Sequence, residues 1–206
     1  RGSISQTVSR PELREIAPFG YIDYITGVKI SGNPNIQRSL VHNYDLRYEL
    51  YPNAGEIVSV SLFYKKFSSP IEEIYSPGQN NPEKTFDNAR SGAENYGIEL
   101  EMRKKLGFLG KVFTDFTINA NLTFLNSSVD LKDLQSISTE KTRRMQGQSP
   151  YTVNLGLFYD NYELGTSVNL LYNRFGRRIS EVGNNGFGDI FENGNDVLDF
   201  SASKRL

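Results

Sequence analysis

The feature that most constrains the fold is the stretch of residues 43–66, which alternates polar and apolar residues on both sides of one short turn. One face of its first arm is apolar and consists of Tyr44, Leu46, Tyr48 and Leu50. The other face is polar and consists of Asn43, Asp45, Arg47 and Glu49. An alternation of period two is typical of a β-strand that lies between two unlike environments. The stretch therefore predicts a β-hairpin with one apolar and one charged face.

The same alternation returns along the rest of the chain. It predicts eight long strands, which lie at about 2–10, in the two arms of the 40–67 hairpin, and at about 93–105, 112–125, 151–159, 164–172 and 196–206. Long loops separate them at about 11–39, 68–92, 126–149 and 176–195. Because these loops are rich in Gly, Pro and Asn, we expect them to be irregular, apart from one helical turn at 131–134.

Short and long connections alternate along the chain, so every short turn falls at one end of the sheet and every long loop at the other. This asymmetry is typical of outer-membrane barrels, which have short periplasmic turns and long extracellular loops. Strands of about 10–13 residues also suit a tilted crossing of a ~25 Å apolar band. A soluble β-sandwich that binds a ligand such as a glycan is the alternative, because its strands alternate in the same way.

Composition excludes several classes of protein. A net charge of −1 over 206 residues gives no case for a nucleic-acid partner. The chain has no Cys and a single histidine, His42, so we expect neither a metal site nor a cofactor. A barrel enzyme is the weakest hypothesis, since His42 restricts the choice of general base and no G-x-S-x-G element occurs. We therefore expect no enzymatic activity.

Six short segments carry a more specific pattern. They are SRPELREIAPF at 9–19, GNPNI at 32–36, NYDLRYE at 43–49, FYKK at 63–66, PIE at 70–72 and NYGIELE at 95–101. In order and spacing they resemble the later barrel portion of TonB-dependent receptors, the Bacteroidetes type in particular. The resemblance covers most of residues 1–110, and the remainder is similar in pattern more than in motif.

This resemblance implies a barrel of 22 antiparallel strands that is plugged by an N-terminal domain and imports scarce nutrients with energy passed through TonB. Residues 1–206 are then expected to be a single all-β fragment of that barrel, without the plug domain and the closing strands. The implied location is the outer membrane of a Gram-negative bacterium. The implied partners are the lipid bilayer and lipopolysaccharide, the plug of the same full-length chain, TonB through that plug, and a nutrient such as siderophore-bound iron or a glycan.

The long loops are the expected site of ligand capture, because they face outward and stand on a rigid wall. Guanidinium groups suit anionic ligands such as a siderophore's carboxylates, and the candidates are Arg143, Arg144, Arg177 and Arg178. Aromatic rings suit stacking on sugars or catechols, and the candidates are Tyr75, Phe86 and Phe187. Solvated loop charges and loop-packing aromatics are the alternative account of the same residues.

Overall fold

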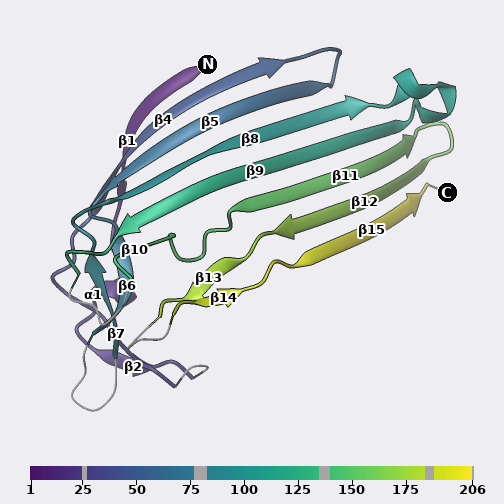
Figure 1. Ribbon diagram of the computed structural model, residues 1–206. Helices are drawn as coiled ribbons and strands as arrows, with labels where there is room; N and C mark the ends of the chain where they lie inside the picture. The colour runs from purple at the N-terminus through teal and green to yellow at the C-terminus, as the bar shows by residue number, and fades with distance from the viewer. Residues whose placement is uncertain (25–26, 77–82, 135–139, 184–187, 206) are drawn as a thin grey trace.

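A computed structural model describes residues 1–24, 27–76, 83–134, 140–183 and 188–205. Its long strands are β1 (Gly2–Ser9), β4 (Ser39–Leu50), β5 (Ile57–Ser68), β8 (Ala93–Lys105), β9 (Phe116–Asp130), β11 (Tyr151–Asn161), β12 (Thr166–Phe175) and β15 (Asp196–Lys204). They pair in chain order as one antiparallel meander, with the short β10 (Thr142–Arg143) beside β9 (Figure 1). The predicted sheet of eight long antiparallel strands is confirmed.

The connections are sorted by length between the two ends of the sheet. Figure 1 shows the three short connections, residues 51–56, 106–115 and 162–165, at one end and the four long connections at the other. We refer to these as the turn end and the loop end. The alternation of short and long connections inferred from the sequence is therefore present in the fold.

One strand begins later than expected. The sequence predicts a strand from Val112, but residues 107–113 form two 3₁₀ turns, η1 (Gly107–Leu109) and η2 (Lys111–Phe113), and β9 begins at Phe116. Gly110 separates these turns with a φ of 134°, which residues with a Cβ rarely adopt. At its other end β9 continues to Asp130, so five residues assigned to the loop belong to the strand.

The strand register keeps residues of one kind on one face across the sheet. A single row of paired residues on the apolar face runs through Tyr48, Val60, Leu100, Leu122 and Val153. The adjacent row on the other face runs through Glu49, Ser59, Glu101, Asn121 and Asn154. Since a slip of one residue would mix the two sets, this register fixes one continuous apolar face and one continuous polar face.

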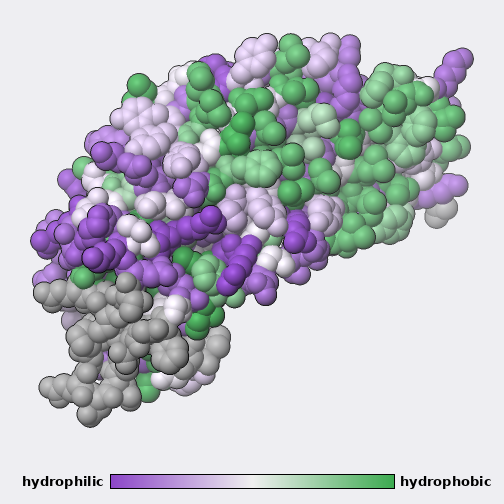
Figure 2. All heavy atoms as spheres, in the orientation of Figure 1, coloured by the Kyte–Doolittle hydropathy of each residue, from purple (hydrophilic) through white to green (hydrophobic). Residues whose placement is uncertain are grey.

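The two faces differ in exposure. On the apolar face Leu46 is 60% exposed and Leu198 is 67% exposed, whereas Ser59 on the polar face is only 2% exposed. Figure 2 shows hydrophobic residues gathered over the sheet and hydrophilic residues near the loop end. A β-sandwich buries the apolar faces of its sheets against each other. The sandwich alternative is wrong, because the apolar face of this sheet is bare.

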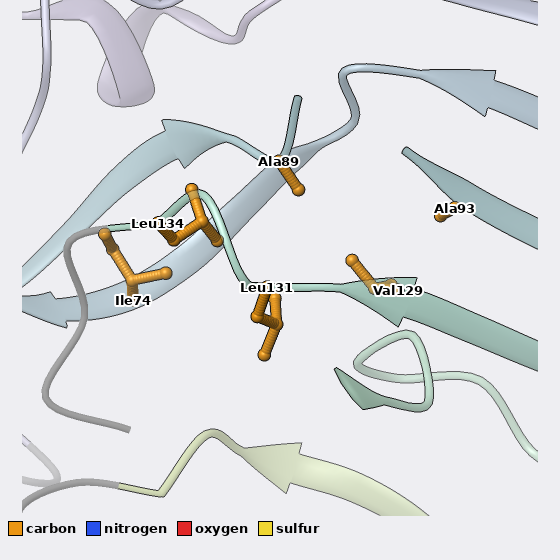
Figure 3. Packing of buried hydrophobic residues seen from close by; sticks show 6 residues of the cluster. All are labelled: Ile74, Ala89, Ala93, Val129, Leu131 and Leu134. Atoms are coloured by element: carbon orange, nitrogen blue, oxygen red, sulfur yellow. The ribbon is translucent and has the colours of Figure 1, made fainter. Parts of the chain in front are cut away.

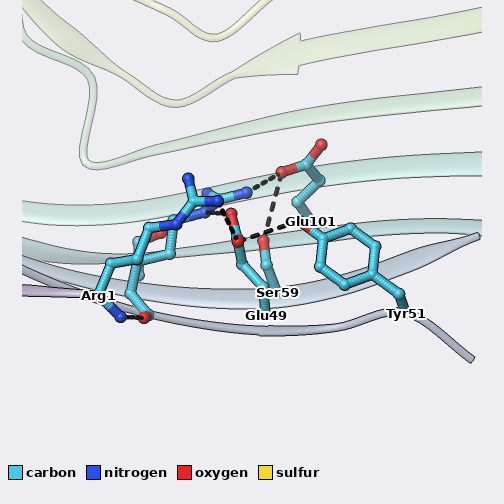
Figure 4. A network of polar contacts seen from close by, with 7 residues as sticks. Arg1, Glu49, Tyr51, Ser59 and Glu101 are labelled. Carbon is cyan, nitrogen blue, oxygen red and sulfur yellow. Dashed lines mark hydrogen bonds and ion pairs between the residues drawn. The ribbon is translucent and has the colours of Figure 1, made fainter.

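Charged side chains pair across the strands on the polar face (Figure 4). Arg47 donates to Glu49 at 2.7 Å and to Glu101 at 2.6 Å. Ser59 adds a hydrogen bond to Glu101 at 3.2 Å, and the Tyr51 hydroxyl donates to Glu49 at 3.0 Å. These bonds connect β4, β5 and β8. Polar side chains on three neighbouring strands are therefore connected to one another on this face.

The long connections contain regular structure, so the expectation of irregular loops is wrong. They hold α1 (Leu13–Ile16), β2 (Gly20–Ile22), β3 (Lys29–Ser31), β6 (Ile71–Ser76), β7 (Glu83–Asn88), β13 (Arg178–Glu181) and β14 (Ile190–Glu192). One sheet has the order β2-β3-β7-β6 and joins the first two loops, with β3 parallel to β7. A second sheet pairs β13 with β14. No helix among the described residues is long and apolar enough to cross a membrane.

A small hydrophobic core fastens the loops to the sheet (Figure 3). It consists of Ile74, Ala89, Ala93, Val129, Leu131 and Leu134. Ala93 and Val129 are paired with each other on the polar face, in phase with Asn95, so the loops fold over that face at the loop end. The helical turn expected at 131–134 is a single hydrogen-bonded turn, in which the amide of Leu134 donates to the carbonyl of Leu131 at 3.1 Å.

Candidate functional site

The described parts of the four long connections form one assembly, which we call the loop layer and which comprises residues 10–24, 27–38, 69–76, 83–92, 131–134, 140–150, 176–183 and 188–195. Its first two segments share the β2-β3-β7-β6 sheet. They are also joined by Asn88 in β7, which accepts a hydrogen bond from the amide of Gln37 at 2.7 Å and donates to its carbonyl at 2.9 Å. The last two segments are joined by Gln146, which donates to the carbonyl of Ser180 at 2.9 Å.

A buried lysine links the second segment to the fourth. The side chain of Lys84 in β7 is 4% exposed, and its Nζ lies 3.1 Å from a carboxylate oxygen of Glu73 in β6 and 3.1 Å from one of Glu181 in β13. Burial disfavours the ammonium form, but the two carboxylates outweigh this effect and raise the pKa of Lys84. Lys84 is therefore a charged bridge inside the loop layer.

A buried arginine links the third segment to the second. Arg143 in β10 donates to a carboxylate oxygen of Glu72 at 2.7 Å and to the carbonyl of Glu73 at 3.1 Å. The side chains of Arg143 and Glu72 are 3% and 6% exposed. Burial raises the pKa of Glu72, and the charge of Arg143 and its hydrogen bond oppose that rise. Together with Lys84, this ion pair makes the loop layer one connected unit.

Described residues of the loop layer line three pockets whose size suits a small ligand. The largest has a volume of about 890 Å³ and is lined by residues that include Tyr21, Tyr24, Lys84 and Glu181. Another has a volume of about 610 Å³ and is lined by residues that include Glu72, Met145, Gln148 and Arg178. Within the described ranges, no three side chains of His, Cys, Asp or Glu converge as metal ligands do.

The third pocket, which we call the arginine pocket, has a volume of about 700 Å³ and is lined by Arg144, Arg174, Arg177 and Arg178 together with Gln148, Pro150, Tyr151, Ile179, Phe191, Asn193 and Gly194. None of these residues is acidic. Arg177 stacks on Phe191, with its guanidinium carbon 3.9 Å from the ring centroid.

The structure brings three of the predicted ligand contacts together and separates the others. Arg144, Arg177 and Arg178 line the arginine pocket. Arg143, Tyr75 and Phe86 are buried, at 7%, 4% and 7% exposed. Arg143 is engaged with Glu72, while Phe86 packs against Ile30 and Ile36. Phe187 lies outside the described residues.

Sequence reasoning missed Arg174, the fourth arginine of the pocket. Arg174 lies in β12, on the same apolar face of the sheet as Leu170 and Tyr172 of that strand. The sequence did contain a signal for Arg174, because a charged residue at the next alternate position after apolar residues marks the end of the apolar band. The ion pair of Arg174 with Asp196, at 2.5 Å, crosses to the neighbouring β15.

Solved structures with the same fold include receptors and a transporter. The ferric enterobactin receptor PfeA of Pseudomonas aeruginosa is 16% identical, with a TM-score of 0.63, and the match covers 100% of this chain and 30% of that one. The siderophore receptor PirA of Pseudomonas aeruginosa is 19% identical, with a TM-score of 0.64 and coverages of 98% and 32%. The copper transporter OprC is 16% identical, with a TM-score of 0.69 and coverages of 100% and 28%.

This chain thus spans about 30% of the length of the solved structures that it matches. A comparison with curated protein sequences finds no significant match. Residues 1–206 match the family described as TonB dependent receptor-like, beta-barrel. The match covers the whole chain and agrees with the bare apolar face, the meander order and the sorted connections. The chain belongs to the TonB-dependent receptor family and forms part of its β-barrel.

Proposed function

We propose that the complete protein is an outer-membrane transporter that imports a scarce nutrient, and that residues 1–206 supply part of its barrel wall and its extracellular loops. The observation that carries this proposal is the bare apolar face, on which Leu46 and Leu62 are 60% and 48% exposed. A continuous apolar face with side chains this exposed is stable in contact with lipid and unfavourable in contact with water. The chain is then a transport component and performs no catalysis.

In this arrangement the apolar face contacts lipid and the polar face lines the lumen. The turn end faces the periplasm and the loop layer faces the outside of a Gram-negative cell. The plug of the same full-length chain occupies the lumen against Arg47, Glu49 and Glu101, and TonB acts through that plug. The loop layer folds over the polar face, as Ala93 and Val129 show, which supports its role as the entrance to the lumen.

The buried and exposed candidates have different roles in this proposal. Arg143 and Tyr75 hold the loop layer in shape and do not touch the nutrient, since their side chains are enclosed, whereas Phe86 is largely buried but lines two of the pockets of the loop layer. Arg144 and Arg177 remain available to an anionic group, whereas Arg178 is paired with Glu192 at 2.6 Å. The nutrient classes that fit the proposal are siderophore-bound iron, a glycan or a similar scarce compound. The similar structures are a ferric enterobactin receptor, a siderophore receptor and a copper transporter, which supports import of scarce compounds as a class.

Uptake by a strain that lacks the gene tests the proposal directly. Growth on a panel of ferric siderophores, glycans and copper as limiting nutrients is measured with and without the full-length gene on a plasmid. We expect growth on one nutrient class to require the gene, and to be lost when TonB is removed. Growth that never depends on the gene on any tested nutrient would contradict the proposal, as would full-length protein that stays in the aqueous phase without detergent.

A further inference from the structure

We propose that the nutrient crosses the lumen along the uncharged half of this wall, over β9, β11 and β12, and not along the half formed by β4, β5 and β8. This inference rests on the proposed function and adds a route to it. It follows from the chemistry of the polar face, which divides into two strips. The strips lie side by side in one sheet and share the same rows of paired residues.

The first half of the polar face, which we call the charged strip, carries ionised side chains along its whole length. They are Asp45, Arg47 and Glu49 in β4, Lys65 in β5, and Glu99, Glu101 and Arg103 in β8. Arg47 is engaged with Glu49 and Glu101. Lys65, Glu99 and Arg103 have no ion pair within the described part of the chain. Charges of both signs thus remain open on this strip.

Open charges of both signs suit a folded protein surface, because such a surface presents matching charges in a fixed register. The plug of the same full-length chain is the occupant that the proposed function places there. A small solute cannot match all of these charges at once, and covering an unmatched charge is strongly unfavourable. Charge-assisted hydrogen bonds are also roughly twice as strong as neutral ones, so they exchange less readily. The charged strip therefore suits a partner that stays in place.

The second half of the polar face, which we call the uncharged strip, offers hydroxyl and amide groups. They belong to Thr117, Asn119, Asn121, Thr123 and Ser127 in β9, Thr152 and Asn154 in β11, and Ser167, Asn169 and Asn173 in β12. The other residues of these strands on this face are glycine or apolar, apart from Asp160 at the turn end. Asn173 donates to the side-chain oxygen of Asn154 at 2.6 Å. Neutral groups of this kind exchange hydrogen bonds with water and with a passing solute at little cost.

The loop end of the uncharged strip lies beside a pocket of the loop layer. The amide of Met145 donates to the hydroxyl oxygen of Ser127 at 3.1 Å, so Met145 lies over the polar face where β9 ends. Met145 and Gln148 both line the pocket of about 610 Å³. The side-chain oxygen of Gln148 is buried and accepts no hydrogen bond from the described residues. A hydroxyl or amide group of a nutrient would satisfy this oxygen at the entrance to the strip.

Labelling of single cysteines in the complete receptor tests the route. Thr152→Cys places a thiol on the uncharged strip, and Glu99→Cys places one on the charged strip. Both residues pair with Thr123, so the two thiols lie in one row and at the same depth. The probe is a small hydrophilic methanethiosulfonate reagent added to intact cells. We expect Thr152→Cys to react at least about tenfold faster than Glu99→Cys, because the plug covers the second thiol as the core of a protein interface.

The attached group should also obstruct the route. Labelled Thr152→Cys should take up the nutrient identified by the growth panel at least about tenfold more slowly than the same variant before labelling, because a wall contact is replaced by a bulky group. Glu99→Cys, treated with the same reagent, is the matched control and should keep its uptake rate. Equal labelling of the two thiols in urea-denatured receptor verifies that both are reactive.

Two outcomes would overturn the proposed route. One is labelling of Glu99→Cys at least as fast as that of Thr152→Cys in intact cells. The other is unchanged uptake after complete labelling of Thr152→Cys. Failure of the proposed function is distinguishable from both, because a wild-type receptor that supports no uptake of any nutrient refutes transport itself, whereas uptake that survives the label refutes only the route.

Discussion

The buried pair of Arg143 and Glu72 gives the sharpest test of how the loop layer is held together. Replacing Arg143 with Met keeps much of the side-chain volume and leaves the carboxylate of Glu72 buried without its partner. Removal of one member of a buried ion pair typically costs about 3–5 kcal/mol. Because β10 lies in the third loop and Glu72 in the second, we expect this cost to appear as opening of the loop layer and not as unfolding of the barrel wall.

The pH dependence of this effect has a definite sign. The pKa of Glu72 is raised by burial, so the folded state binds its proton more tightly than the unfolded state does. The stability from this carboxyl is then present at acid pH and is lost as pH rises through the raised pKa. Loss of Arg143 removes the group that opposes the rise. The defect of Arg143→Met should therefore shrink as the pH falls, because protonation neutralises the unpaired carboxyl.

Hydrogen exchange of the β6 and β7 amides in the complete receptor measures this opening free energy. Measurements at about pH 5 and about pH 8, corrected for intrinsic exchange, should show the defect of Arg143→Met decreasing in acid. Glu72→Gln strands an arginine and cannot titrate at this position, so its own opening free energy should change less between the two pH values than that of Arg143→Met. The double variant should recover most of the loss. The exposed pair of Lys29 and Glu83 serves as the control cycle, with a coupling of about 0–1 kcal/mol. Equal coupling in the two cycles would refute the reasoning.

Three further predictions concern the barrel wall and its turns. Leu122→Arg should destabilise the membrane-inserted receptor by ~2–4 kcal/mol and Asn121→Arg by much less in denaturant unfolding, since these neighbours lie on opposite faces, and equal effects would mean that the faces are exchanged. Gly97→Ala should weaken the β8–β9 pairing measured by hydrogen exchange, because an added Cβ would lie 2.3 Å from the Phe124 carbonyl oxygen and 2.7 Å from the Phe63 ring; an unchanged exchange rate would contradict this clash. Hydrogen bonds from Lys104 and Asn53 lower the pKa of Glu56. The ionised carboxylate therefore stabilises the fold at pH values above the ordinary pKa of a glutamate, and this stabilisation is lost as the pH falls through the lowered pKa. Thermal unfolding of Glu56→Gln should show a defect that fades in acid, unlike that of the exposed control Glu163→Gln.

The barrel wall was predictable from the sequence because its signal is local and repeated. Alternation along residues 43–66 set the faces of two strands, and the register of the whole sheet follows the same period. The late start of β9 escaped prediction. Val112 and Phe116 look equally strand-like in sequence, and only the backbone at Gly110, with its φ of 134°, separates turn from strand.

The loop layer was much less predictable, because its contacts join segments far apart in the chain. Arg143 and Glu72 are 71 positions apart, and Lys84 and Glu181 are 97 apart. No local pattern distinguishes an arginine that will be buried beside a carboxylate from one that stays in solvent. The sequence therefore placed Arg143 and Arg144 in the same class, while the fold encloses the first and exposes the second. The sequence identified three of the four arginines of the pocket by the chemistry of their side chains. That these arginines lie together in one pocket could be seen only in the folded structure.

The parallel pairing of β3 with β7 limits how this surface can be exchanged between receptors. β7 receives its neighbours β3 and β6 from two different loops, and Lys84 within it needs Glu73 in β6 and also Glu181 in β13. If the segment that contains β7 were transplanted alone into another barrel, β7 would lack its partner β3. Lys84 would keep Glu73 but lose Glu181, so its buried charge would be only partly neutralised. The four segments of the loop layer therefore depend on one another structurally. Recombination or engineering that alters specificity must exchange all four between receptors as a set.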